Sequence, residues 1–227
     1  MTLLTLVLLT LFVGLGRWQW HRGEAKQAVW NAYERNDYTP ALDAPVDLES
    51  ADRFKRVAFS AGHFEPDHQF LLDNISHAGQ AGYEVLTPYV LRDGRRILVN
   101  RGWVPFTGYR DRLPDVSMSN RFATVSGRID DLPTAGLASG RAPPEAGDRW
   151  PKVTAFPTHA ELEGALGEKI ARRVLLLDVQ AGDIGYVREW SPPGMAPSRH
   201  FSYAIQWWGF AGVLLVLYFG LNFRKVS

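Results

Sequence analysis

The sequence predicts an α+β membrane protein in which two transmembrane helices, one near each end, flank a mainly antiparallel β barrel or sandwich with short helices. Residues 1–16 and 201–223 contain no charged side chain and are rich in apolar ones. Between them, short runs alternate apolar and polar residues, a pattern typical of half-buried strands. These observations together predict an extramembrane domain anchored by two helices.

Residues 1–20 are the first predicted transmembrane helix. Its uncharged run is short for a span, but Trp18 and Trp20 suit the membrane interface and Arg17 can snorkel towards water. The alternative is the core of a signal peptide. Residues 13–16 are a poor cleavage site, however, and no basic segment precedes the apolar run. We therefore expect an uncleaved helix.

The domain follows a helical extension at residues 21–38 and is expected to cover residues 39–198. Strands are predicted at residues 54–59, 70–75, 83–91, 96–104, 122–129 and 173–178. Asp93 and Gly94 predict a two-residue hairpin turn, because both residue types tolerate positive φ. Thr158 and Glu161 have the spacing of a capping box, which predicts a short helix ending near Leu166.

Residues 199–223 are the second predicted transmembrane helix, and residues 224–227 are a predicted cytoplasmic tail. The uncharged part would span about 34 Å as a helix, against about 30 Å of bilayer hydrocarbon. Arg224 and Lys225 favour a cytoplasmic C-terminus, although basic residues also follow the first helix. Long loops translocate largely regardless of charge, so the domain is expected on the outer side of the membrane.

Composition excludes several classes of function. The 25 basic and 24 acidic side chains nearly cancel, so nothing indicates a nucleic-acid partner. With no cysteine, the chain has no disulfides, no thiolate nucleophile, no thiolate metal site and no c-type haem attachment. No motif pairs a nucleophile with a base or cradles a phosphate. We predict that the protein is not an enzyme.

His200 is the candidate ligand that stands out, because it lies where the second apolar run begins. On a helix it shares a face with Tyr203, Ala204, Trp207 and Ala211. An imidazole is a good axial ligand for haem iron, and the two small alanines would leave room for a flat macrocycle. The alternative is an interfacial histidine among belt aromatics, hydrated by headgroup water.

Two further segments contain candidate functional residues. In residues 100–105 a strand ends with Gly102 beside Trp103, where a backbone or a partner can approach closely. The alternative there is a tryptophan that covers the core. In residues 62–68, a histidine with two carboxylates suggests a divalent metal, but a solvated strand end explains the same residues.

Four blocks, in this order and spacing, resemble signatures of the surfeit locus protein one family: GRWQWHR at residues 16–22, GHF at 62–64, NRGWVP at 100–105 and HFSYAIQWW at 200–208. The resemblance covers the whole chain. It implies a two-span protein that assists assembly of haem-copper cytochrome c oxidase, with its domain on the outer side of a bacterial plasma membrane or a mitochondrial inner membrane. The absence of an Arg- and Ser-rich presequence favours the bacterial membrane. It also implies that His200 is a ligand for haem a, which is handed to oxidase subunit I.

The expected function is therefore that of an oxidase assembly factor which binds haem a through His200, with Tyr203 and Trp207 shaping the pocket. His21 is a less favoured second ligand. Arg101, Gly102 and Trp103 are the predicted partner-binding residues. The expected partners are oxidase subunit I, haem a synthase and the lipid bilayer. The alternative is a scaffold that recruits these proteins and binds no haem.

Overall fold

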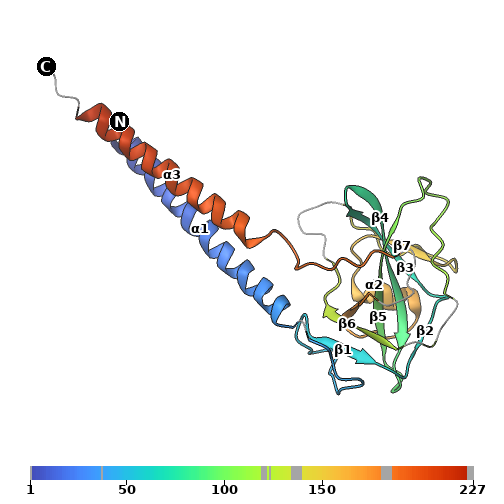
Figure 1. Cartoon of the computed structure of the whole chain (residues 1–227). Coiled ribbons are helices and arrows are strands. Elements are labelled where there is room, and N and C mark those ends of the chain that lie inside the picture. Colours follow the sequence, from blue (N-terminus) through green and yellow to red (C-terminus); the bar gives the residue numbers. More distant parts are fainter. Residues whose placement is uncertain are drawn as a thin grey trace. The chain divides into compact units, whose positions relative to one another are not determined.

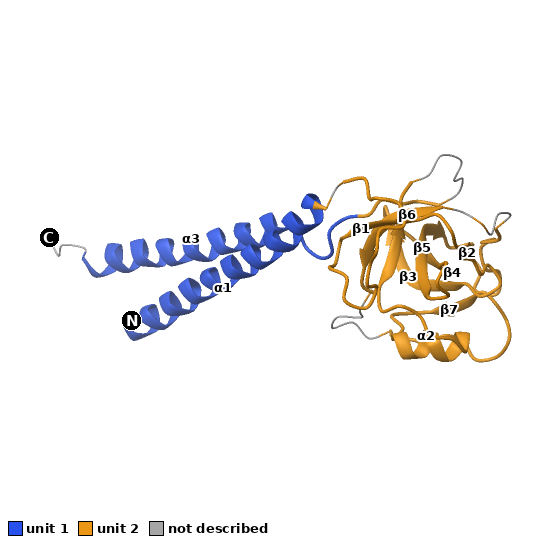
Figure 2. Cartoon of the chain, turned by 90° about the horizontal axis from the view of Figure 1, so that it is seen from below, with its two compact units in different colours: residues 1–35, 191–227 blue, residues 36–190 orange. Residues whose placement is uncertain are grey.

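The computed structural model describes residues 2–36, 38–118, 122, 124–133, 140–179 and 186–223 of the chain. It divides into two compact units, which are coloured separately in Figure 2. One unit contains Met1–Arg35 and Ser191–Ser227, and the other contains Asn36–Trp190. The predicted cytoplasmic tail at residues 224–227 lies outside the described residues.

The first unit is a pair of antiparallel helices, α1 (Thr2–Arg35) and α3 (Pro197–Asn222). They lie side by side over most of α3, with Thr2 close to Tyr218, and the C-terminal part of α1 extends beyond the start of α3 (Figures 1 and 2). Pro197 is in the first turn of α3, where its missing N–H is not needed. Both helices are long and apolar enough to cross a membrane.

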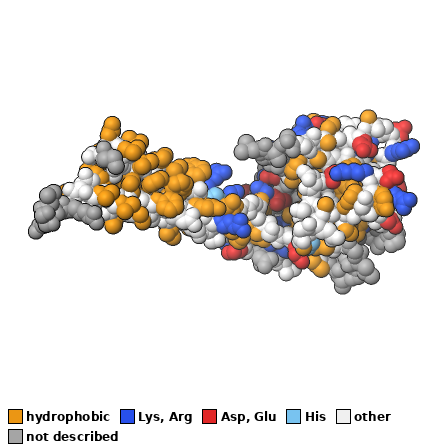
Figure 3. Space-filling model, turned by 90° about the horizontal axis from the view of Figure 1, so that it is seen from above, with side chains coloured by type: hydrophobic (Ala, Val, Ile, Leu, Met, Phe, Trp, Pro, Cys, Tyr) orange, Lys and Arg blue, Asp and Glu red, His pale blue; other side chains and the backbone are white. Residues whose placement is uncertain are grey.

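Much of the surface of the helix pair is apolar, as the face seen in Figure 3 shows, whereas α1 from Arg17 onwards carries charged side chains such as Arg22 and Glu24. A helix of a water-soluble protein presents a polar face to solvent, whereas these helices expose large apolar side chains around their outer surface. The exposed side chains include Leu3, Leu6, Val7, Leu11, Ile205, Val213, Val216, Leu217 and Leu221. This surface suits lipid rather than water.

The second unit is built on one sheet of eight strands (Figure 1). Its order is β1-β6-β8-β5-β4-β3-β7, with β2 pairing to β4. The strands are β1 (Arg56–Phe59), β2 (His63–Phe64), β3 (Phe70–His77), β4 (Gln80–Val90), β5 (Arg96–Pro105), β6 (Val125–Asp130), β7 (Lys152–Thr154) and β8 (Val174–Leu177).

The sheet is open and mixed, so the prediction of a barrel or sandwich is wrong. β1 and β7 form its two edges instead of pairing with each other. Most neighbours are antiparallel, but β7 pairs with β3 in parallel, and β8 pairs with β5 in parallel. Alternation along the sequence identified β8 but not its partner, and β7, only three residues long, was not among the predicted strands.

Apolar side chains cover both faces of the sheet. One cluster includes Tyr89, Ile97 and Leu175, and a second packs Phe70 and Leu98 beneath the short helix α2 (His159–Leu166). The capping box predicted at the start of α2 is confirmed, because Thr158 and Glu161 bond reciprocally. Gly167 ends the helix in the left-handed conformation.

Candidate functional site

His200 lies one turn into α3 and is half-buried. Its Nδ1 is 2.9 Å from Oε1 of Gln19, which belongs to α1. Both residues are in the same compact unit. The candidate ligand is therefore held by a polar contact that joins the two helices.

This contact determines which ring nitrogen of His200 is available. An amide oxygen only accepts, so the proton of the neutral ring lies on Nδ1 and the lone pair remains on Nε2. Within the described part of the chain, no hydrogen bond or ion pair engages Nε2. Histidines that bind metals usually donate their other N–H to a carbonyl or carboxylate in this way. In His200 the ring nitrogen left with a lone pair is therefore Nε2.

The two alanines predicted to leave room for a macrocycle are instead buried between the helices. Ala204 is 0% exposed and Ala211 is 5% exposed. Small residues on α1 complete the close packing: a Cβ at Gly16 would lie 2.2 Å from Nε1 of Trp208, and one at Gly23 would lie 2.6 Å from the Phe201 ring. At these positions the two helices are in close contact, so the two alanines leave no space between the helices for a macrocycle.

Trp207 and Tyr203, the other two predicted pocket residues, differ in position. Trp207 is half-buried and stacks on Phe12 of α1, with 5.7 Å between ring centroids. It also contacts Phe210. Tyr203 is 44% exposed on the outer surface of the helix pair. Of these two residues, Tyr203 is the one that is exposed on the surface of the pair.

His21, the less favoured second ligand, has both ring nitrogens engaged within α1. Nδ1 is 2.9 Å from a carboxylate oxygen of Glu24, and Nε2 accepts from Arg17 at 3.4 Å. The side chains of His21 and Glu24 are more than half exposed. These contacts favour His200 over His21 as a ligand.

Arg101, Gly102 and Trp103 lie inside the second unit. Arg101 and Trp103 are each 7% exposed. The backbone of Trp103 exchanges two hydrogen bonds with Val187, and a Cβ at Gly102 would lie 2.8 Å from the Val187 carbonyl oxygen. The close approach expected at this glycine is made by the chain's own backbone. A role of the three residues in binding a partner stays a prediction.

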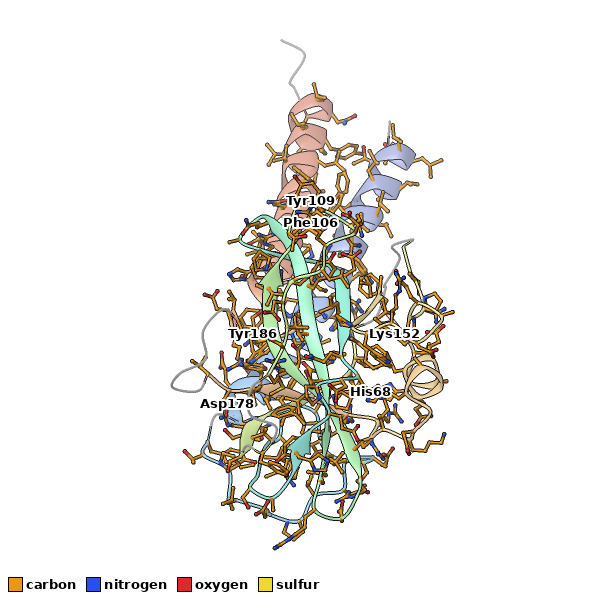
Figure 4. All side chains as sticks on the ribbon, turned by 90° about the vertical axis from the view of Figure 1, so that its right-hand side faces the viewer. His68, Phe106, Tyr109, Lys152, Asp178 and Tyr186 are labelled. Atoms are coloured by element: carbon orange, nitrogen blue, oxygen red, sulfur yellow. The ribbon has the colours of Figure 1, made fainter. Side chains whose placement is uncertain are left out.

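The side chain of Arg101 belongs to a buried polar network. It donates to Oε1 of Gln69 at 2.8 Å and to the Val116 carbonyl at 2.9 Å, and it lies over the ring of Tyr186. Arg188 also contacts Tyr186 and donates to the Arg101 carbonyl. Tyr186, whose ring both guanidinium groups contact, is labelled in Figure 4. These contacts hold residues 186–188 against β5.

The histidine and carboxylates at residues 63–67 are used in other contacts. The His63 ring packs on Phe122, and Glu65 forms an ion pair with Arg96. Among the residues that the structure describes, no group of three or more His, Cys, Asp or Glu side chains is placed to hold a metal ion.

Sequence reasoning overlooked Gln19. The available signal was its helical spacing: Gln19 lies three or four residues from Gly16 and Gly23, on the face of α1 that carries its buried residues. Sequence reasoning also missed the contact between Gln69 and Arg101, which no periodicity indicates, because Gln69 precedes β3 and Arg101 lies in β5, 32 residues further along the chain.

Comparison with known proteins gives one family. The model of the SURF1 family, the surfeit locus protein one family, matches residues 6–212. A SURF1-like protein of Rickettsia felis is 22% identical over 95% of this chain and 94% of its own length. Uncharacterised SURF1-like proteins of Mycobacterium tuberculosis and Mycobacterium bovis are 28% identical over 74% of this chain. The matched region spans only 59% of the mycobacterial proteins.

Proposed function

The chain belongs to the SURF1 family, which is generally linked to cytochrome oxidase assembly, and from this premise we propose that it is a membrane-anchored assembly factor for haem-copper cytochrome c oxidase. The observation that carries the proposal is the extent of the family match. It reaches from residue 6 to residue 212 and so includes most of α1 and more than half of α3. The proposal assigns no catalytic step to the protein.

The proposed location is a bacterial inner membrane, which α1 and α3 both cross, with the β domain on the outer side. The proposal that α1 and α3 anchor the protein in the membrane is supported by their length and by the apolar side chains that they expose. An outer location would put the domain on the side where a newly inserted oxidase subunit exposes its extracytoplasmic loops. Oxidase subunit I and haem a synthase are the proposed partners.

We further propose that haem a is the cargo and that His200 is its axial ligand. Haem a would supply the iron, and Nε2 of His200 is the donor that is available to it. Because the two alanines leave no space between the helices, the macrocycle would lie against the outer flank. There Tyr203 provides exposed aromatic surface, whereas Trp207 is half-buried and stacks on Phe12 of α1. His200 would hold the iron through a single side chain, which would suit a carrier that must release its cargo to subunit I.

A second candidate is a scaffold that recruits subunit I or haem a synthase without binding haem. The burial of Ala204 and Ala211 favours it, because the small residues of α3 are used for helix packing. On this view His200 serves to join α3 to Gln19 of α1.

The test is the visible spectrum of the full chain, purified in detergent after co-expression with the haem a biosynthetic enzymes. We expect a haem a band that is lost in His200→Ala. His21→Ala is the matched control and should keep the band. Equal bands in all three proteins would exclude His200 as the ligand, and no band in any of them would favour the scaffold.

The assembly role is tested separately in a deletion strain. We expect less oxidase activity and less haem a in the oxidase, with haem a synthesis itself retained. Complementation by the wild-type chain should restore both. Normal oxidase in the deletion strain would contradict the assignment whether or not the purified protein binds haem.

A further inference from the structure

We propose that Gln19 is the positioning residue for His200: through the bond between the helices, it fixes the proton on Nδ1 and presents Nε2 as the ligand atom. The inference concerns the same site as the proposed function and rests on it for the role of His200 as a haem ligand. The contact itself, 2.9 Å between His200 Nδ1 and Gln19 Oε1, is independent of that role.

Gln19 is a polar residue on the less exposed face of α1. The same face of α1 carries Phe12, Gly16 and Gly23 at three- and four-residue spacings from one another or from Gln19. A primary amide turned towards a neighbouring helix in apolar surroundings is costly unless it is hydrogen-bonded. His200 is the partner that the structure gives to its carbonyl oxygen.

The register of the helices keeps Gln19 opposite His200. On the N-terminal side of Gln19, Gly16 lies against the indole of Trp208, and on the C-terminal side Gly23 lies against the ring of Phe201. At both glycines a Cβ would come within 2.6 Å of the opposing aromatic ring. Sliding one helix along the other would replace these glycines by larger side chains. The bond to His200 is thus held in place by contacts on both sides.

The partner of His200 is a neutral amide and not a carboxylate, and this difference affects how strongly the imidazole binds a metal. A carboxylate partner makes a ligating imidazole a stronger donor, whereas a neutral carbonyl fixes the tautomer with less effect on donor strength. A neutral carbonyl partner suits a carrier, because the haem must later be released from His200. We therefore infer that Gln19→Glu strengthens the hold of His200 on a haem and that Gln19→Leu weakens it.

The first test needs no haem. In ¹⁵N-histidine spectra of the full chain in detergent, recorded at mildly alkaline pH, we expect His200 to show a protonated Nδ1 and an unprotonated Nε2. In Gln19→Leu the signal should move towards the Nε2-protonated form that free imidazole side chains prefer. Gln206→Leu removes an exposed amide from α3 and should leave the His200 signal unchanged. An unchanged His200 tautomer in Gln19→Leu would overturn the inference.

The second test is titration with haem a. Loss of a residue that orients a metal ligand typically weakens binding by about 10- to 100-fold. We expect a loss of this size in Gln19→Leu, tighter binding in Gln19→Glu and no change in Gln206→Leu. Binding by Gln19→Leu that equals wild type would contradict the positioning role.

The variants separate failure of this inference from failure of the proposed function. If His200→Ala binds haem a as well as wild type does, the ligand assignment is wrong, although the tautomer test still decides the role of Gln19. If His200→Ala abolishes binding and both Gln19 variants behave as wild type, only the positioning role is wrong. If Gln19→Leu fails to fold, titration of Gln19→Glu with haem a still tests the inference, because binding no tighter than that of wild type would contradict the positioning role.

Discussion

At the scale of single residues, Gly102 is required both by its backbone angle and by the close approach of residues 186–188. Its φ is +117°, and three atoms of residues 186–188 lie within 3.2 Å of the place where a Cβ would be. Gly102→Ala combines backbone strain with a clash against the Val187 carbonyl. We expect it to lower the free energy of unfolding by about 2 to 4 kcal/mol, measured by denaturation of the full chain in detergent.

Gly108→Ala is the matched control for this prediction. Gly108 also has positive φ, but no atom lies within 4 Å of its Cβ position. Gly108→Ala should therefore lower the free energy of unfolding only through backbone strain, by about 1 kcal/mol. Equal losses in the two variants would mean that the approach of Val187 does not constrain Gly102.

Glu84 gives a pH dependence at the same scale. Burial raises the pKa of its carboxyl above the usual value of 4.5, while the bond from Asn100 opposes that rise and the charge of Asp130 adds to it. As pH rises through 4.5 the unfolded chain ionises first. Stability therefore falls from that pH up to the raised pKa of the folded state and remains lower above it.

Glu84→Gln should remove this penalty. We expect no gain in thermal stability at about pH 4 and a clear gain at about pH 7.5. Glu34→Gln, which removes an exposed carboxylate from α1, is the control and should show no such pH-dependent gain. A gain from Glu84→Gln of the same size at both pH values would show that packing, not ionisation, explains it.

At the scale of elements, Gly16 determines how closely α1 approaches α3. Gly16→Leu would place a side chain where the Trp208 indole lies, and we expect the helices to separate locally by about 1 to 2 Å. The chain has no cysteine, so spin labels can be attached at Leu6→Cys and Leu217→Cys, two exposed sites. The distance distribution between the labels measures the separation.

Gly14→Leu is the control for that measurement, because no atom lies within 4 Å of its Cβ position. It should leave the distribution as in wild type. A wild-type distribution in Gly16→Leu would show that the Trp208 side chain can move aside without shifting the helix.

The elements themselves were largely predictable, because local periodicity and capping determine them. The strand expected at residues 96–104 is observed as β5 (Arg96–Pro105). The turn before it was predicted less well. Gly94 has positive φ, but Leu91 N donates to the Arg95 carbonyl, so the turn includes residue 92 and is longer than the predicted two-residue turn.

At the scale of the whole molecule, the orientation in the membrane is a testable part of the proposal. Ser117→Cys is in the β domain and is exposed, whereas Ser227→Cys is in the predicted cytoplasmic tail. A thiol reagent that cannot cross membranes should label Ser117→Cys in intact spheroplasts and label Ser227→Cys only after lysis. The reverse pattern would place the domain in the cytoplasm.

The sequence by itself determined the two apolar helices, most of the strands and the identity of His200 as a candidate ligand. These follow from composition and from spacings of two or three to four residues, which act locally. Only the tertiary structure decided that the sheet is open and mixed, that Arg101 and Trp103 are buried, and that Gln19 bonds to His200. Each of these depends on residues far apart in the chain, whose pairing is set by packing and not by any local pattern.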